Sequence, residues 1–370
     1  MPDFYIGLMS GTSLDGVDGV LVDFSPRMPL VVEHASAPFA PALRAELLEL
    51  NTSGPDELHR AALAGNALVR VYAQVVGQLL AGARVAAADV RAIGAHGQTV
   101  RHRPQQFDGT GYTLQLCQPA LLAELTGIDV AADFRSRDVA AGGQGAPLAP
   151  FFHQGIFARP GEAVGVLNIG GISNLTLLRA DGSILGFDCG PGNALIDAWC
   201  ARHTGRPYDA GGAWAATGNV LAPLLERLLA EPYFRLAPPK STGRDLFSAA
   251  WLDRQLDAIR PAAAPADVQA TLAELTARAC AADVTRHQPD LRKLVVCGGG
   301  VLNGDLMRRL RACLPDVQVS SSADWGLPPL QVEASAFAWL ARRAVRREKL
   351  ELQSVTGARG ARVLGCLYPS

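Results

Sequence analysis

The chain has 370 residues, 49% of them hydrophobic and 19% charged, and its 34 lysines and arginines almost balance its 35 aspartates and glutamates. A composition this apolar excludes an intrinsically disordered chain, and a net charge of -1 lacks the basic excess that is usual in nucleic-acid binding. At roughly 100 to 200 residues per domain, the length predicts two domains, with three small ones as the alternative.

The sequence also argues against a secreted or membrane protein. Its start enters an alternating polar and apolar pattern at once, without the basic and hydrophobic regions of a signal peptide. The most apolar window, residues 163–178, is interrupted by glycine and asparagine and is shorter than the ~20 residues of a membrane span. The cysteines show no C-x-x-C spacing. We therefore expect a cytoplasmic protein with no membrane or nucleic-acid partner and no structural zinc.

The first part of the chain alternates predicted strands and helices, as α/β architecture requires. Residues 4–9 and 17–24 are period-2 runs joined by the polar segment 10–16, which predicts a β-hairpin. Apolar residues at helical spacing predict helices over 41–50 and 57–80. The elements that follow are a strand at 92–96, a helix at 119–125 and a strand at 128–134.

The second part repeats the opening pattern. Strands are expected at 164–169, 175–178 and 184–187, separated by glycine-containing turns. Later elements are helices from 193 and at 219–230, 266–286, 305–314 and 331–348, and a strand at 293–297. The repetition predicts two related α/β domains facing each other. We place one in residues 1–126 with 347–370 and the other in residues 127–346.

The turn of the first hairpin is the first candidate site. Its glycines permit positive φ and bring backbone N–H groups near an anion, its hydroxyls add donors, and its carboxylates can orient a hydrated cation. The candidate phosphate-binding residues are Gly11, Thr12, Ser13, Leu14, Asp15, Gly16, Val17 and Asp18. An ordinary hairpin turn with hydroxyl and carboxylate caps is the alternative interpretation.

Two further glycine turns can complete a nucleotide site. The first contains Asn168, Gly170 and Gly171 and would close on the other side of a polyphosphate. The second contains Gly298, Gly299 and Gly300 and joins a strand to a helix, a junction that permits close approach of a ribose or adenine. Neither a Walker A lysine motif nor a G-x-G-x-x-G fingerprint occurs, so P-loop and Rossmann folds lose their main support.

Asp188 is the candidate catalytic base. It ends a predicted strand and precedes Gly190-Pro191-Gly192 and a helix, so its carboxylate can project into a cleft and accept a proton from water or a hydroxyl. The alternative is an acidic residue that only pins the turn before the helix.

Polar residues near other element ends are candidates for hydrogen bonds to a sugar or a carboxylate. They are His96, Gln98, Thr99, Asp133, Arg135 and Glu333. A histidine in such a position is more often structural than catalytic. Arg135 suits a carboxylate clamp, although an ion pair with Asp133 or Asp138 explains it equally well.

Together these motifs resemble the anhydro-N-acetylmuramic acid kinases almost from end to end. The matching segments are GLMSGTSLDGVD at 7–18, HGQT at 96–99, DFR at 133–135, NIGGISN at 168–174 and FDCGPGN at 187–193. The resemblance implies the two-domain actin-like ATPase (ribonuclease H-like) fold of sugar kinases, actins and heat-shock chaperones, with a nucleotide cleft between the domains. It also implies a cytoplasmic homodimer that recycles murein.

The resemblance further implies a coupled reaction, in which 1,6-anhydro-N-acetylmuramic acid, ATP and water give N-acetylmuramic acid 6-phosphate and ADP. Asp188 would activate the water that attacks the anomeric carbon, and the departing O6 would attack the γ-phosphoryl group. Phosphoryl transfer would thus replace protonation of the leaving oxygen. Mg²⁺ would neutralise phosphate charge through water held near Asp15 or Asp18, and its direct ligands stay open.

The family's motifs place individual roles on this chain. Residues 11–18 match its ATP phosphate segment, and Asp188 matches its general base. The residues that match positions near the sugar are His96, Gln98, Thr99, Asp133, Arg135 and Glu333, with Arg135 facing the lactyl carboxylate. Cys189 departs from the hydroxyl residue of many relatives, which puts a side-chain hydrogen bond at that position in doubt.

Two other functions are weighed against this one. A simple hexose or amino-sugar 6-kinase of the same superfamily would use Asp188 to deprotonate a free hydroxyl. A non-catalytic, nucleotide-gated binding protein would need a peptide-binding or polymer-contact module, and we expect no room for one in this chain.

Overall fold

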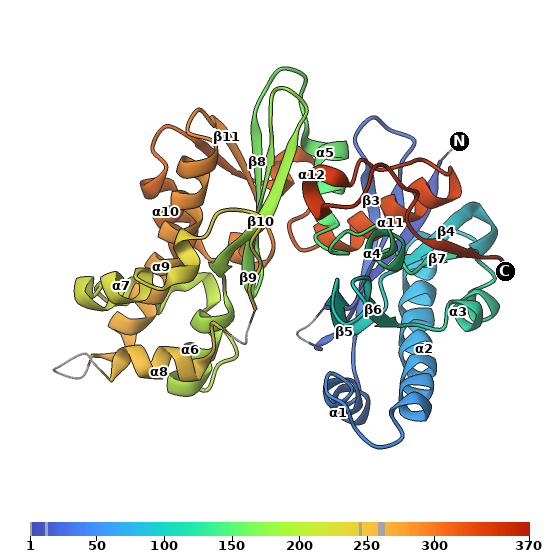
Figure 1. Cartoon of the computed structure of the whole chain (residues 1–370), viewed down its shortest axis with the longest axis horizontal. Helices are drawn as coiled ribbons and strands as arrows, with labels where there is room; N and C mark the ends of the chain where they lie inside the picture. The colour runs from blue at the N-terminus through green and yellow to red at the C-terminus, as the bar shows by residue number, and fades with distance from the viewer. Residues whose placement is uncertain (1, 12–13, 244–245, 258–262) are drawn as a thin grey trace. The chain divides into compact units, whose positions relative to one another are not determined.

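The chain forms two units, each built around one main sheet (Figure 1). The computed structural model describes residues 2–11, 14–243, 246–257 and 263–370. The first unit comprises Met1–Phe152 with Gly326–Ser370, and the second comprises His153–Trp325.

The first unit contains a six-stranded sheet in the order β13-β7-β4-β1-β2-β3. Its strands are β1 (Phe4–Met9), β2 (Gly16–Asp23), β3 (Leu30–Pro38), β4 (Val90–Ala95), β7 (Val130–Ala132) and β13 (Cys366–Tyr368). The first three strands form an antiparallel meander, and β4 and β7 continue the sheet in parallel with β1. The predicted hairpin is therefore confirmed. A separate two-stranded sheet pairs β5 (Gln98–Pro104) with β6 (Gly111–Leu116).

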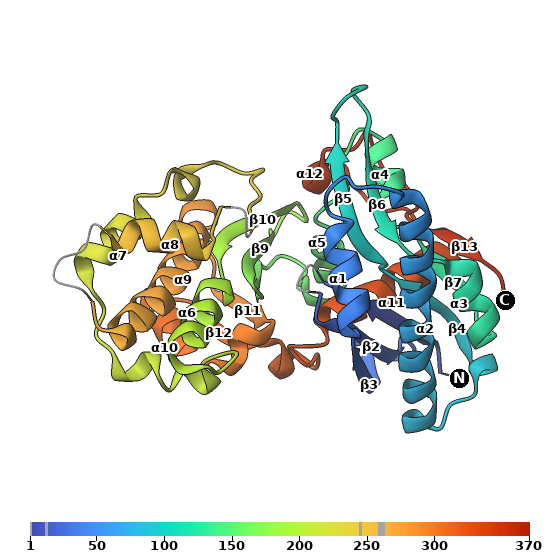
Figure 2. The ribbon, with the colours of Figure 1, turned by 90° about the horizontal axis from the view of Figure 1, so that it is seen from below.

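Helices cover both faces of this sheet (Figure 2). A Cβ on Gly19 would meet Val75 and Leu79 of α2, whereas a Cβ on Gly7 would meet the backbone of α11. Gly7 pairs with Val20, so Gly7 and Gly19 face opposite sides and the two helices lie on opposite faces. The helices of this unit are α1 (Pro41–Glu49), α2 (Glu57–Ala83), η1 (Ala87–Asp89), α3 (Pro119–Thr126), α4 (Ser136–Ala140), α11 (Val332–Val345) and α12 (Gln353–Thr356). Helix α5 (Ala149–Phe157) crosses the limit between the two units.

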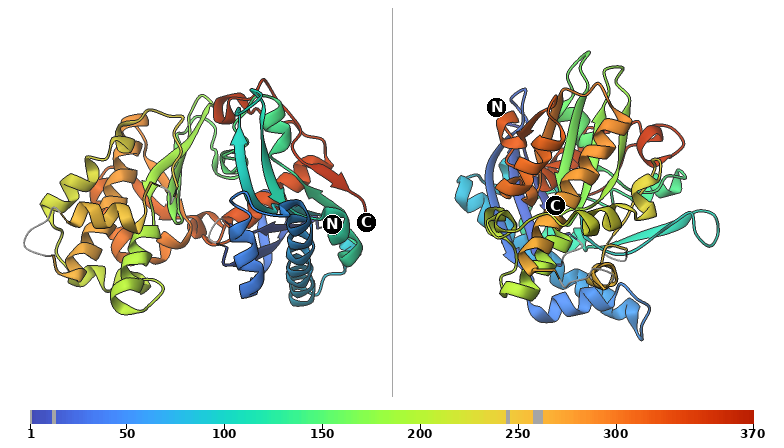
Figure 3. Two further views of the ribbon diagram at one scale, coloured as in Figure 1. Left: turned by 60° about the horizontal axis from the view of Figure 1, so that its bottom comes forward. Right: turned by 90° about the vertical axis from the view of Figure 1, so that its left-hand side faces the viewer.

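The sheet of the second unit repeats the topology of the first. Its strands are β8 (Val164–Ile169), β9 (Ile172–Leu178), β10 (Ile184–Pro191), β11 (Lys293–Cys297) and β12 (Gln318–Ser321), in the order β10-β9-β8-β11-β12. The first three, side by side in Figure 3, are antiparallel, and β11 and β12 follow in parallel with β8. The strands β3-β2-β1-β4-β7 of the first unit have the same order and directions. The expectation of two related α/β domains is thus confirmed.

Helix α9 (Pro265–His287) is the central helix of the second unit. It packs against β10, α6, α7 and α10, and one buried cluster lies between it and the sheet while another lies among the helices. The remaining helices are α6 (Ala194–Thr204), η2 (Ala210–Gly212), η3 (Ala215–Thr217), α7 (Ala222–Leu229), η4 (Pro232–Arg235), α8 (Ala249–Leu256), η5 (Gly299–Leu302), α10 (Gly304–Cys313) and η6 (Ser322–Trp325).

The limits of the units differ from those placed from the sequence. The chain divides after Phe152 and after Trp325 instead of after residues 126 and 346. Two elements account for the difference: β7 pairs with β4 in the first sheet, and α11 packs on β1 and β4. Long-range pairing of this kind leaves no mark in local periodicity.

Candidate functional site

The β1–β2 turn is fixed from the inside by buried groups. Ser10 is buried, and its Oγ donates a hydrogen bond to the Gly97 carbonyl at 3.0 Å and lies 2.9 Å from the Tyr72 hydroxyl. Leu14 adopts a left-handed backbone with φ of 57°, and its N–H donates to the Gly11 carbonyl at 3.2 Å. Thr12 and Ser13, two of the predicted phosphate-binding residues, lie outside the described residues.

The other predicted residues of this turn divide into buried anchors and exposed carboxylates. Leu14 and Val17 are buried, so their side chains anchor the turn in the core and do not face a ligand. Asp15 and Asp18 are exposed. Their carboxylates lie 4.0 Å from the Arg44 guanidinium and 3.6 Å from the His34 ring, distances that leave both open to solvent and cations.

Behind this turn, His96 links Ser10 to Arg135. The His96 Nδ1 lies 3.1 Å from the Ser10 carbonyl, and its Nε2 lies 3.0 Å from Arg135 Nη2. Guanidinium nitrogens only donate, so Nε2 accepts and Nδ1–H donates to the carbonyl. Burial, followed by the Arg135 charge, lowers the pKa of His96 to about 3, so the ring is neutral at pH 7. His96 therefore serves here as a neutral bridge.

Arg135 and Gln98 bring further polar groups to the same cluster. Arg135 Nη1 donates to the Gly145 carbonyl at 2.8 Å. Burial lowers the pKa of Arg135 to about 10, although the negative charges of Glu333 and Asp138 act to raise it. Gln98 Nε2 donates to the Gly11 carbonyl at 3.2 Å, while its buried Oε1 has no hydrogen-bond partner among the described residues. The structure thus brings His96, Gln98 and Arg135 into one cluster, and the charge of Glu333 acts on Arg135.

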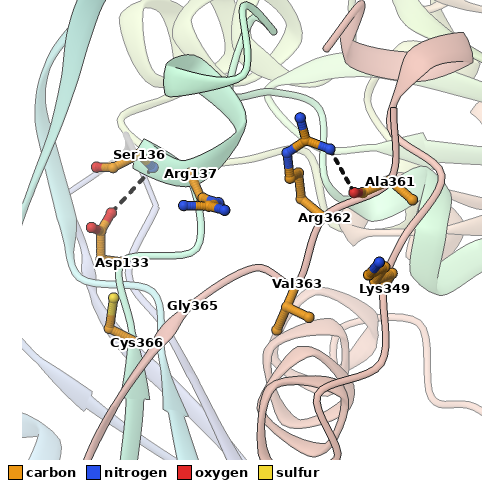
Figure 4. Close-up of a pocket in the computed structure, with 9 residues that line it drawn as sticks. All are labelled: Asp133, Ser136, Arg137, Lys349, Ala361, Arg362, Val363, Gly365 and Cys366. Carbon is orange, nitrogen blue, oxygen red and sulfur yellow. Dashed lines mark hydrogen bonds between the residues drawn. The ribbon is translucent and has the colours of Figure 1, made fainter. Parts of the chain in front are cut away.

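Thr99 and Asp133, also predicted near the sugar, have different surroundings. The Thr99 hydroxyl accepts a hydrogen bond from Gln115 Nε2 at 3.2 Å between β5 and β6. Asp133 is exposed and accepts a hydrogen bond from the Ser136 N–H. Its carboxylate lines a hollow of about 680 Å³ with Arg137, Arg362 and Lys349, to which none of the other predicted sugar residues contributes (Figure 4).

In the second unit, glycine turns from distant parts of the sequence meet. The β8–β9 turn receives hydrogen bonds from the start of α6, where the Asn193 N–H donates to the Gly170 carbonyl at 2.8 Å. Gly298 has φ of +80°, and a Cβ there would lie 2.3 Å from Asn168 Oδ1. Because glycine alone tolerates both conditions, the Gly298–Gly300 junction can lie directly against Asn168 and Ile169.

Contrary to the prediction, Asp188 does not end its strand, because β10 continues to Pro191; it lies within β10, where the register shifts between Asp188 and Gly190, and it is held by a neighbouring loop. The Thr242 N–H donates to Asp188 Oδ2 at 3.0 Å, and the Asp188 N–H donates to the Lys240 carbonyl at 3.2 Å. Tyr233 donates its hydroxyl proton to the Asp188 carbonyl at 2.8 Å. The second carboxylate oxygen, Oδ1, accepts no hydrogen bond from the described residues.

Burial shifts the pKa of the Asp188 carboxylate toward neutral pH. It raises the pKa of Asp188 to about 6, against the lowering effects of the Thr242 N–H and the Lys240 charge. A carboxylate in this range is mostly ionised at pH 7 and still basic enough to accept a proton. The raised pKa and an oxygen that the described residues leave without a hydrogen bond together fit a general base.

Sequence reasoning missed several residues that shape these clusters. They are Tyr72, which supports Ser10, and Tyr233, Lys240 and Thr242, which surround Asp188. Tyr72 falls on the apolar face of the predicted helix 57–80 and is indistinguishable there from a core residue. The other three lie in segments without periodicity or motif, and only the fold brings them to β10.

Comparison with known proteins finds sequence relatives along the whole chain. The family model described as anhydro-N-acetylmuramic acid kinase matches residues 3–370. A protein of that name from Variovorax paradoxus is 65% identical over 100% of this chain and 99% of its own, and one from Albidiferax ferrireducens is 60% identical over 100% of both. A solved structure, the activator of the 2-hydroxyisocaproyl-CoA dehydratase from Clostridium difficile with bound ADPNP, is 11% identical with a TM-score of 0.49, covering 93% of this chain and 96% of that one.

The repeated topology of three antiparallel strands followed by two parallel ones defines the actin-like, ribonuclease H-like class, as the sequence predicts. A glycine-containing polar turn joins the first two strands of each sheet. Within this class the chain belongs to the anhydro-N-acetylmuramic acid kinase family. The predicted family and the prediction of a kinase are thereby confirmed. Among the described residues, no helix is both long and apolar enough to cross a membrane.

Proposed function

We propose that this protein uses ATP and water to convert 1,6-anhydro-N-acetylmuramic acid into N-acetylmuramic acid 6-phosphate and ADP, in the recycling of murein. The Asp188 carboxylate carries the proposal, because it combines a raised pKa, one oxygen anchored by the Thr242 N–H and one that accepts no hydrogen bond from the described residues. Membership of the family supports the choice of substrate.

The chemistry assigned to Asp188 is the activation of water. Asp188 Oδ1 accepts a proton as the water oxygen bonds to C1 of the sugar, and the C1–O6 bond breaks with its electron pair going to O6. O6 then bonds to the γ-phosphorus, and the bond from that phosphorus to the ADP oxygen breaks. The leaving oxygen of the first step is the nucleophile of the second, so no separate acid is needed.

The nucleotide is assigned to the glycine turns of both units. Gly11, Asp15, Gly16 and the backbone of Leu14 and Val17 would meet the phosphates from the first unit, with Asp18 beside them. From the second unit, Asn168, Gly170 and Gly171 would meet the phosphates and Gly298–Gly300 the nucleoside. Support comes from the strict steric demand at Gly298 and from the hydrogen bonds that fix the β8–β9 turn. Thr12 and Ser13 keep their predicted place on sequence grounds.

Mg²⁺ is the proposed metal. Kinase sites hold this ion through one or two carboxylates, phosphate oxygens and water, so a full protein cage is not required. The exposed carboxylates Asp15 and Asp18 on the β1–β2 hairpin fit that description, because both are solvated and weakly paired. Bound there, the ion would neutralise phosphate charge.

The sugar is assigned to the cluster around His96. Arg135 would bind the lactyl carboxylate, for which its buried guanidinium is suited, and the unpartnered Oε1 of Gln98 offers an acceptor for a hydroxyl or amide. Thr99, Asp133 and Glu333 remain assigned to the sugar by family resemblance. The protein would work as a homodimer in the cytoplasm, which sedimentation and cell fractionation can test.

The test supplies ATP with either the 1,6-anhydro sugar or open N-acetylmuramic acid, in water enriched in ¹⁸O. We expect 6-phosphate from the anhydro form, with the label on the C1 hydroxyl and none in the phosphate. Rapid phosphorylation of the open sugar would instead support a simple 6-kinase. Nucleotide binding without turnover of either sugar would support a nucleotide-gated binding protein.

A further inference from the structure

A short loop segment, residues 238–242, runs beside β10 at Asp188, and we call it the strap. β10 is an edge strand of its sheet, so its outer backbone groups need partners from elsewhere. For Asp188, the Lys240 carbonyl of the strap accepts from its N–H, and the Tyr233 hydroxyl of η4 donates to its carbonyl. The strap also binds the side chain, because the Thr242 N–H donates to the Asp188 carboxylate. The position of one carboxylate oxygen therefore depends on where the strap lies.

The strap is itself fixed by a buried ion pair. Lys240 Nζ lies 2.9 Å and 3.2 Å from the two carboxylate oxygens of Asp283 on α9, and the two side chains are 1% and 3% exposed. The ammonium also lies over the rings of Phe187 and Tyr233, at 5.5 Å and 5.1 Å from their centroids. Every one of these contacts is within the second unit.

A buried ion pair is a poor device for stability alone. Desolvation of the two charges can exceed their attraction, and apolar replacements of similar volume are often as stable. Such a pair does fix the positions of its two side chains, because a buried charge without its partner is strongly unfavourable. Its position next to the candidate base indicates that geometry is its purpose.

We propose that Lys240 is a positioning residue for Asp188, which anchors the strap on Asp283 and so fixes the carboxylate with Oδ1 free for water. The proposal rests on the role of Asp188 in the proposed function. It adds a second effect, since the Lys240 charge favours the ionised form of the base.

Among the described residues, charged and titratable groups reach the base from four elements. The strap contributes Lys240, η4 contributes Tyr233, β10 itself contributes Cys189, and α9 contributes Cys280, Asp283, Arg286 and His287. Lys240 is the cation that lowers the pKa of Asp188. Loss of its charge therefore raises this pKa, and the acid limb of the pH–rate profile moves to higher pH.

The experiment compares Lys240→Met with the wild type. We expect kcat at pH 7 to fall roughly 10- to 100-fold through misplacement of the base. The KM for ATP is expected to stay unchanged, and the acid limb of kcat to move to higher pH. Arg286 Nη1, 3.5 Å from Asp283, stays as a partner for the orphaned carboxylate. If the single variant does not fold, Lys240→Met with Asp283→Asn removes both charges and is expected to show the same shift.

Lys293→Met is the matched control. It breaks an exposed ion pair of 2.6 Å with Glu162 in the same unit and should leave kcat and the acid limb unchanged. A folded Lys240 variant that keeps both the wild-type kcat and the wild-type acid limb of the pH–rate profile overturns the proposal. A variant that loses kcat while its acid limb stays at the wild-type pH overturns it as well. Asp188→Asn distinguishes failure of the positioning role of Lys240 from failure of the proposed function, because full turnover by that variant shows that Asp188 is not the base.

Discussion

The Asp188 carboxylate is subject to opposed influences from its surroundings. Burial favours the protonated acid, whereas the Thr242 N–H and the Lys240 charge favour the carboxylate. The balance leaves the pKa near the working pH of a general base, which an exposed aspartate would not reach.

Replacement of this carboxylate by its amide tests the assignment. Asp188→Asn preserves size and the hydrogen bond from Thr242 but cannot accept a proton, so kcat is expected to fall roughly 100- to 10,000-fold. Nucleotide affinity, measured by calorimetry, should stay at the wild-type value. Asp181→Asn, an exposed acid in the β9–β10 turn, serves as the control and should keep full activity. Near-normal product formation by the Asp188 variant would remove the base.

The pH dependence follows from the same group. Because Asp188 works in its ionised form and its pKa is about 6, kcat/KM should rise about tenfold per pH unit below 6 and level off above it. Initial rates between pH 4.5 and 8 measure this, with folding checked by circular dichroism at each pH. A flat profile across pH 5 to 7 would contradict the assignment.

Side chains at the candidate sites were predictable where a motif marked them. His96, Gln98 and Arg135 stood in short polar motifs, and the fold brings them into one cluster. Burial of Leu14 and Val17 was not predictable, because a ligand turn and a core contact use the same alternating pattern. Lys240 was not predictable either, because its partner Asp283 is 43 residues away.

At the scale of elements, the approach of α11 to the first sheet depends on two paired glycines. Gly7 and Gly94 are neighbours on β1 and β4, and Cβ atoms there would lie 1.9 Å from the Ala334 carbonyl oxygen and 2.0 Å from that of Phe337. The helix therefore rests directly on the strands. This contact places Glu333 near Arg135 and the Phe337 ring 4.7 Å from that of His96.

One methyl group at this contact should be costly. Gly7→Ala forces the backbone of α11 away from the sheet, and we expect a loss of about 3 kcal/mol in the free energy of unfolding. Gly77→Ala is the matched control, because a Cβ on that helical glycine meets nothing within 4 Å. It should gain about 0.5–1 kcal/mol through helix propensity. Denaturant unfolding of both variants measures the difference, and equal stability would contradict the packing described here.

Elements with strong periodicity were predictable, and weakly patterned ones were not. The strands β1, β2, β8 and β9 and the long helices follow the apolar spacing of the sequence. β3 is mostly solvent-exposed or half-buried along its length, so it lacks the apolar face by which strands are found. The β5–β6 pair stands outside the main sheets and is likewise polar on much of its surface.

At the scale of the whole molecule, two sheets of one topology carry the glycine turns at equivalent places. The strand, glycine turn and strand pattern predicted this repeat, and the order β3-β2-β1-β4-β7 matches β10-β9-β8-β11-β12. The limits of the units were not predictable, because α11 returns to the first sheet after the whole second unit. Such a return is a tertiary event with no local signal.

The most direct test of the account is a crystal structure with a non-hydrolysable ATP analogue and the 1,6-anhydro sugar. We predict that the terminal phosphate is bound by the β1–β2 turn on one side, with O6 of the sugar on the other. A water molecule should lie within hydrogen-bond distance of Asp188 Oδ1 and in line with C1. A complex in which Asp188 contacts neither this water nor the sugar, or in which the phosphates bind away from residues 10–18, would contradict the proposed enzyme.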